Sequence, residues 1–77
     1  MIFHDRITVN PQVMVGKPVV KGTRLSVEFI LELLAEGWTN DQIIDQYPNL
    51  TAQDIKACLE YAVAVLRFEM VFPVAAE

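Results

Sequence analysis

The chain has 77 residues, of which 53% are hydrophobic and 21% charged, and its formal net charge is −4. This length allows one small domain, and a single cysteine (Cys58) and a single histidine (His4) exclude an internal disulfide framework and a cysteine-based zinc site. No apolar run approaches the roughly 18 residues of a membrane span, and the charged N-terminus does not resemble a signal peptide, so we expect a cytoplasmic protein without a membrane partner.

The apolar content is high for so short a chain. A small domain buries a smaller fraction of its surface than a large one, so its own core has limited room for apolar side chains. The surplus indicates that part of the apolar surface is buried against a partner, and we expect a homodimer.

The charges are unevenly distributed along the chain. Residues 1–24 carry +3, from four basic residues against Asp5, whereas residues 25–77 carry −7. Because phosphate contacts from Lys and Arg supply most of the affinity for nucleic acids, the acidic body disfavours general nucleic-acid binding. The basic end can still contact phosphate locally; the alternative is that both ends are ordinary solvated surface.

The N-terminal part of the chain favours extended structure. Short β-favourable runs occur at 7–9, 13–15 and 19–21, and Pro11 and Pro18 exclude a helix through this stretch. Strands this short need partners, which leaves pairing within the chain and pairing across a dimer both open. Gly16 and Gly22 predict tight turns, because glycine permits positive φ. The alternative is a backbone nest that holds a phosphate, which is disfavoured because the spacing fits neither the P-loop nor the dinucleotide fingerprint.

Three helices follow. Ser26 is a suitable N-cap for a helix that ends before Gly37, Thr39 begins a capping box for a short helix that Pro48 ends, and Thr51 caps the third helix. The sequence therefore predicts a mainly α, three-helix, homeodomain-like or winged-helix-like helix-turn-helix fold with a short N-terminal β element. One domain is expected over residues 1–70, followed by an apolar tail over 71–77.

The third helix carries two apolar stripes. The first comprises Ile55, Leu59, Ala62, Val63, Leu66 and Met70, and the second is displaced from it by well over 90°. A helix that is apolar on two sides is buried on two sides, so we expect one stripe in the domain core and the other against a partner. The predicted interface combines the second stripe with the tail; the alternative is a tail that folds back over its own core. Its residues are Cys58, Tyr61, Val65, Phe68, Val71, Phe72 and Val74.

Two sequence motifs point to a family. Gly-Lys-Pro-Val-Val-Lys-Gly-Thr-Arg occupies 16–24 and Tyr-Pro-Asn-Leu-Thr occupies 47–51. Residues 7–62 resemble the small bacterial family called domain of unknown function 433. The resemblance implies the helix-turn-helix fold and an antitoxin-like role in a type II toxin–antitoxin pair, beside a PIN-like ribonuclease toxin. Residues 68–77 are then the candidate toxin-binding segment.

A second hypothesis is a DNA-binding repressor, acting on the operator of its own operon. The first turns of the third helix would enter the major groove, where Gln53 can read adenine and Lys56 can reach phosphate or guanine, although Asp54 opposes both. Arg24 has an alternative role in an ion pair with Glu28. The candidate nucleic-acid contacts are Arg6, Lys17, Lys21, Arg24, Gln53 and Lys56.

No pattern indicates catalysis, a metal site, a cofactor or a small-molecule substrate. His4 has no neighbour that forms an obvious dyad with it, and Cys58 lies on an apolar helical stripe, which predicts a buried and unreactive thiol. We therefore do not expect an enzyme. A homodimeric domain without a toxin or DNA partner is the third hypothesis.

Overall fold

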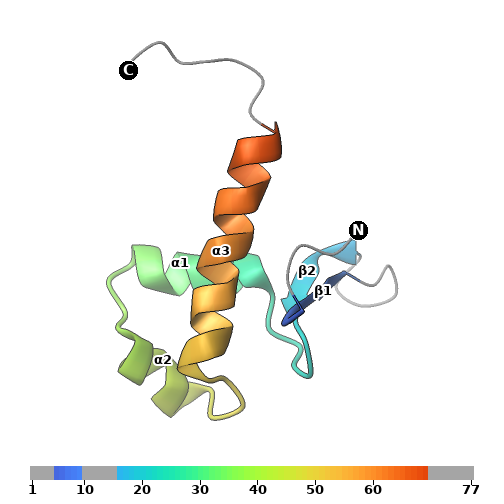
Figure 1. Cartoon of the computed structure of the whole chain (residues 1–77). Coiled ribbons are helices and arrows are strands. Elements are labelled where there is room, and N and C mark those ends of the chain that lie inside the picture. The colour runs from blue at the N-terminus through green and yellow to red at the C-terminus, as the bar shows by residue number, and fades with distance from the viewer. Residues whose placement is uncertain (1–4, 10–15, 70–77) are drawn as a thin grey trace.

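The computed structural model describes residues 5–9 and 16–69 of the chain. Two strands, β1 (Ile7–Val9) and β2 (Pro18–Val20), precede three helices, α1 (Val27–Ala35), α2 (Asn40–Gln46) and α3 (Ala52–Glu69), as Figure 1 shows. The prediction of a mainly helical domain with a short β element at its N-terminal end is confirmed.

The strands pair with each other in an antiparallel hairpin. Ile7 lies opposite Val20 and Val9 lies opposite Pro18, so the pairing is within the chain rather than across a dimer. The hairpin continues into a tight loop in which the backbone N–H of Val20 donates to the carbonyl of Leu25 at 2.9 Å. Gly22 allows this loop because it adopts a φ of 83°, which confirms the predicted turn. The run predicted at 13–15 lies outside the described residues.

Local capping fixes where the first two helices begin and end. The Ser26 hydroxyl accepts from the backbone N–H of Phe29 at 3.0 Å, and Gly37, with φ 99°, follows the C-cap of α1. Thr39 forms the predicted capping box, since both of its reciprocal hydrogen bonds with Gln42 are present. Helix α2 ends at Gln46, as the proline two residues later predicts.

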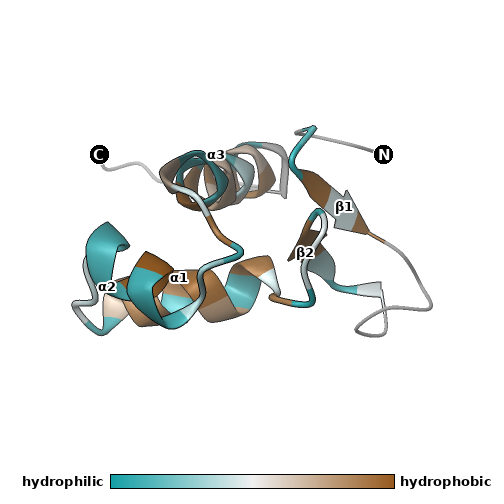
Figure 2. Cartoon of the chain, turned by 90° about the horizontal axis from the view of Figure 1, so that it is seen from below, coloured by the Kyte–Doolittle hydropathy of each residue, from teal (hydrophilic) through white to brown (hydrophobic). Residues whose placement is uncertain are grey.

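The core lies where α1, α3 and the hairpin meet. Seen from below, α3 lies over α1 and the hairpin flanks both helices (Figure 2). Helix α1 buries Leu33 in the core, whereas Leu31 and Leu34 are only partly buried against it. The buried apolar cluster comprises Ile7, Val20, Val27, Ile30, Leu33, Ile43, Leu50, Ile55, Ala57 and Cys58.

A buried carboxylate joins the hairpin to α3. Asp54 Oδ2 accepts from the backbone N–H of Thr51 at 3.0 Å, and Thr51 Oγ1 accepts from the backbone N–H of Asp54 at 3.2 Å, which caps the helix. The other carboxylate oxygen, Oδ1, accepts from Arg6 Nη1 at 3.0 Å, across 48 positions of sequence. Asp54 therefore caps α3 and holds the residue next to β1 at the same time.

Asp54→Ala should destabilise the domain by about 2 kcal/mol, because it removes a cap worth about 1 kcal/mol and leaves the Arg6 guanidinium without its carboxylate. Lys17→Ala is a matched control, since it removes an exposed ion pair with Glu28 (3.1 Å) and should cost about 0.5 kcal/mol or less. Urea unfolding followed by circular dichroism measures both. Equal losses in the two variants would contradict the role assigned to Asp54.

Candidate interaction surfaces

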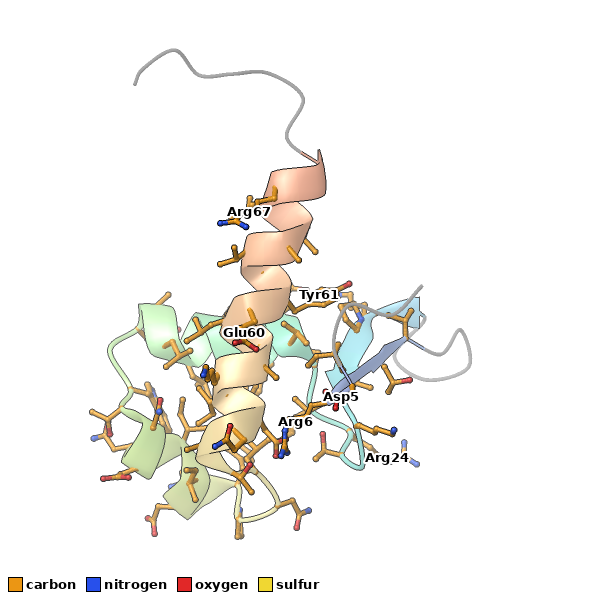
Figure 3. All side chains as sticks on the ribbon, in the orientation of Figure 1. Asp5, Arg6, Arg24, Glu60, Tyr61 and Arg67 are labelled. Carbon is orange, nitrogen blue, oxygen red and sulfur yellow. The ribbon has the colours of Figure 1, made fainter. Side chains whose placement is uncertain are left out.

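Helix α3 packs against its own domain through the stripe that the sequence assigned to a partner. Cys58 is fully buried in the core, so its prediction as an interface residue is wrong. Of the first stripe, Leu59, Val63 and Leu66 are exposed, whereas Ile55 at its N-terminal end is buried in the core. Both stripes are apolar, and the choice between them is made by α1 and the hairpin, which pack on the side of Cys58 and Ala57. Tyr61 accordingly points toward the hairpin and Arg67 away from it (Figure 3).

An apolar groove runs between the N-terminal part of α1, the start of β2 and the C-terminal half of α3. It has a volume of about 350 Å³, and its accessible wall is apolar. Tyr61 and Val65, two residues of the predicted interface, line it, so the structure brings them together with α1. The lining residues are Pro18, Val27, Glu28, Leu31, Tyr61, Ala62, Val65 and Leu66. The Phe68 side chain, Val71, Phe72 and Val74 lie outside what the structure describes.

A second depression, of about 630 Å³, lies at the other end of the molecule, between the loop after β2 and the turn between α2 and α3. Arg24 lines it from the loop, and Asn49 lines it from the turn. The loop is held by Thr23, whose hydroxyl donates to the Val20 carbonyl at 2.8 Å and accepts from the backbone N–H of Leu25 at 3.0 Å. Arg24 is therefore carried on a backbone with fixed hydrogen bonds.

The predicted ion pair of Arg24 with Glu28 is not formed. Glu28 Oε1 instead accepts from Lys17 Nζ at 3.1 Å. Within the ranges that the structure describes, Arg24 forms no side-chain hydrogen bond or ion pair. The sequence gave no signal that Glu28 pairs with Lys17, because this ion pair depends on how the chain runs from strand β2 into helix α1.

The candidate nucleic-acid contacts fall into two groups. Arg6 is bound to Asp54 and Lys17 to Glu28, so both have protein partners. The second group is exposed: Lys21, Arg24, Gln53 and Lys56. Helix α2, the first turn of α3 and the loop after β2 lie at the same end of the molecule (Figure 1), which brings part of the basic N-terminal region beside the predicted recognition helix.

Cys58 is a buried thiol, as predicted. Burial, assisted by the negative charge of Asp54, raises the pKa of the Cys58 thiol from 9.0 to about 12. A thiol with so high a pKa is neutral at physiological pH and is therefore a poor nucleophile or metal ligand. Among the residues that the structure describes, no group of three or more His, Cys, Asp or Glu side chains could hold a metal ion.

The folded chain should therefore react with a disulfide reagent such as DTNB at pH 8 at least about a hundredfold more slowly than the chain in denaturant. The pKa of the Cys58 thiol is higher in the folded state than in the unfolded state. The neutral thiol therefore contributes fully to the free energy of unfolding below pH 9, and this contribution is lost as the pH rises toward 12. Cys58→Ala, as a control, should show a weaker loss of stability over that range. Rapid labelling of the folded protein would contradict the assignment.

The fold and its surfaces define a small three-helix domain with a helix-turn-helix corner at α2 and α3, a hairpin at its N-terminal end and an apolar groove beside α3. The chain belongs to the family described as protein of unknown function (DUF433), whose model matches residues 7–62. No helix in the described part of the chain has the length and apolar character needed to cross a membrane.

Two relatives illustrate the family. The crystal structure of a DUF433 member protein from Anabaena variabilis ATCC 29413 is similar with a TM-score of 0.70 and 28% sequence identity, over 73% of this chain and 55% of that one. The uncharacterized protein y4eO of Sinorhizobium fredii (strain NBRC 101917 / NGR234) is 33% identical over 58 residues. That match covers 75% of this chain and 26% of the relative, so the chain spans about a quarter of the relative's length.

Proposed function

We propose that this chain is a protein-interaction module that acts as the antitoxin of a bacterial type II toxin–antitoxin pair and binds a PIN-like ribonuclease. The observation that carries the proposal is the apolar groove beside α3, which is open to solvent and presents no accessible polar atoms. An apolar groove between two helices is a form of site that receives a helical segment of another protein.

The form of the groove suits an apolar segment of a partner. Its walls come from two helices, α1 and α3, an arrangement that accepts an amphipathic helix through spaced apolar anchors. Each Å² of apolar surface buried in such an interface contributes about 25 cal/mol to the free energy of binding. Residues 71–77 follow α3 in the sequence and supply further apolar side chains for the same partner.

The charge of the helical body suits a ribonuclease. Residues 25–77 carry −7, and Glu28 and Glu32 are exposed on α1. A ribonuclease needs a cationic surface to hold the phosphates of its RNA substrate. An acidic body beside the groove would attract that surface and accelerate association.

Val65→Glu, which puts a charge into the groove, should weaken binding to a co-expressed PIN-like ribonuclease at least about tenfold, because the charge would be desolvated in the complex. Ala62→Trp, which fills the groove without a charge, should act in the same direction. Val9→Glu is the control, because Val9 is an exposed apolar residue on β1.

Co-purification and isothermal titration calorimetry report binding, and circular dichroism verifies that each variant is folded. The proposed site is wrong if both folded groove variants bind the ribonuclease as the unchanged chain does. If the unchanged chain binds no ribonuclease encoded beside it, the antitoxin function itself is wrong.

DNA binding is the second candidate function, favoured by four exposed side chains on elements that lie at one end of the molecule (Figure 1): Lys21, Arg24, Gln53 and Lys56. The fixed loop that carries Arg24 lies beside the turn that leads into α3, so phosphate contacts from the loop and base contacts from the helix are geometrically compatible. The exposed carboxylates of Asp41 and Asp45 on α2 oppose a duplex at this end, which makes this the second candidate.

The double variant Lys21→Ala, Arg24→Ala should weaken binding to the promoter DNA of the chain's own operon and reduce the salt dependence, by about one unit of logarithmic slope per lost phosphate contact. Lys17→Ala is the control: it removes one positive charge, against two in the double variant, from a side chain that pairs with Glu28. Fluorescence anisotropy across a salt series measures the slope. Equal effects of the control and the double variant would exclude this surface as the contact.

A further inference from the structure

The exposed stripe of α3 has the spacing of a helix–helix seam. Leu59, Val63 and Leu66 follow one another at intervals of four and three residues, and their exposed fractions are 47%, 49% and 64%. Alternation of four and three places apolar side chains along one line of a helix, as at the a and d positions of a coiled coil. We call these three residues the outer stripe.

The outer stripe lies on an accessible part of the molecule. The C-terminal half of α3 extends beyond α1, α2 and the hairpin (Figure 1), so a second helix can approach it without meeting the body of the domain. The stripe is also distinct from the apolar groove, because the two share only Leu66. A groove occupant therefore leaves Leu59 and Val63 uncovered.

The charges that border the stripe are self-complementary. Glu60 and Arg67 are both exposed and lie seven residues apart, two helical turns, on the same border of the stripe. When two copies of α3 run antiparallel with Val63 of one opposite Leu66 of the other, Glu60 of each copy comes beside Arg67 of the other copy. A parallel arrangement would place Glu60 beside Ile55 and Arg67 beside Ala62 of the second copy, and neither of these residues is charged.

We propose that the outer stripe is the seam of a homodimer, in which α3 packs antiparallel against α3 of a second copy of this chain. Val63 meets Leu66 of the second copy on both sides of the two-fold axis, and two Glu60–Arg67 ion pairs flank the apolar contact and fix its direction. This inference does not rest on the proposed function, because it needs neither a ribonuclease nor DNA.

The seam is small, so the dimer should dissociate on dilution, and sedimentation equilibrium of the full chain over a wide concentration range measures it. Val63→Glu should raise the dimer dissociation constant at least about tenfold, because it puts a charge into the apolar contact. Val9→Glu is the matched control, with a parent side chain that is 46% exposed against 49% for Val63, and it should leave the dimer unchanged.

Two further variants test whether the groove or the tail, and not the seam, holds the dimer together. Val65→Glu in the groove and removal of residues 71–77 should both leave the dimer intact. A chain that is monomeric at every concentration overturns the proposal, as does a dimer that persists in folded Val63→Glu. Loss of the dimer in Val65→Glu or in the truncated chain would place the contact in the groove or the tail, and would also overturn the proposal.

Charge reversal tests the direction of the seam. Arg67→Glu should weaken the dimer, because Glu60 of each copy would then face a carboxylate of the second copy in place of the guanidinium, and the double variant Glu60→Arg, Arg67→Glu should restore it. The weakening should be greater at low salt than at high salt, as for any exposed pair. If the double variant is no stronger than Arg67→Glu alone while both remain folded, the antiparallel arrangement is wrong.

Discussion

The Asp54 carboxylate holds together two parts of the chain that are far apart in sequence. One oxygen caps α3 through Thr51, and the other accepts the Arg6 guanidinium from the residue that precedes β1. The hairpin has three-residue strands, which are marginally stable alone, so its position depends on contacts with the helices. Asp54 thus joins the start of α3 to the hairpin, which together with α1 covers the face of α3 that carries Ala57 and Cys58.

Local signals in the sequence predicted the elements well. Ser26, Thr39 and Thr51 cap the helices as expected, and Pro48 stops α2, because capping and proline effects act within a few residues and need no tertiary information. The orientation of α3 was not predictable in this way. Its two stripes are both apolar, and the choice between them rests on long-range partners such as Arg6 that no local pattern identifies.

The same distinction applies to the candidate sites. Tyr61 and Val65 were found from helical spacing and do line a surface, whereas Cys58, one turn earlier on the same stripe, is covered by the body of the domain. Helical spacing shows which residues share one side of α3. Which of those residues are buried depends on how far α1 and the hairpin extend along the helix. The acidic charge of the whole chain likewise conceals a local basic surface, because Lys21 and Arg24 sit on a loop that folding carries to the start of α3.

Leu66 lies both on the wall of the apolar groove and in the outer stripe of α3. A ligand that fills the groove and covers Leu66 removes part of the surface available to a second copy, so the two association equilibria share one side chain. If both proposed contacts form, thermodynamic linkage makes the effect reciprocal: occupancy of the groove would lower the affinity between copies by the same factor by which self-association would lower the affinity of the groove. The oligomeric state of the chain would thus report on groove occupancy, and a rise in total concentration would favour release of a groove ligand.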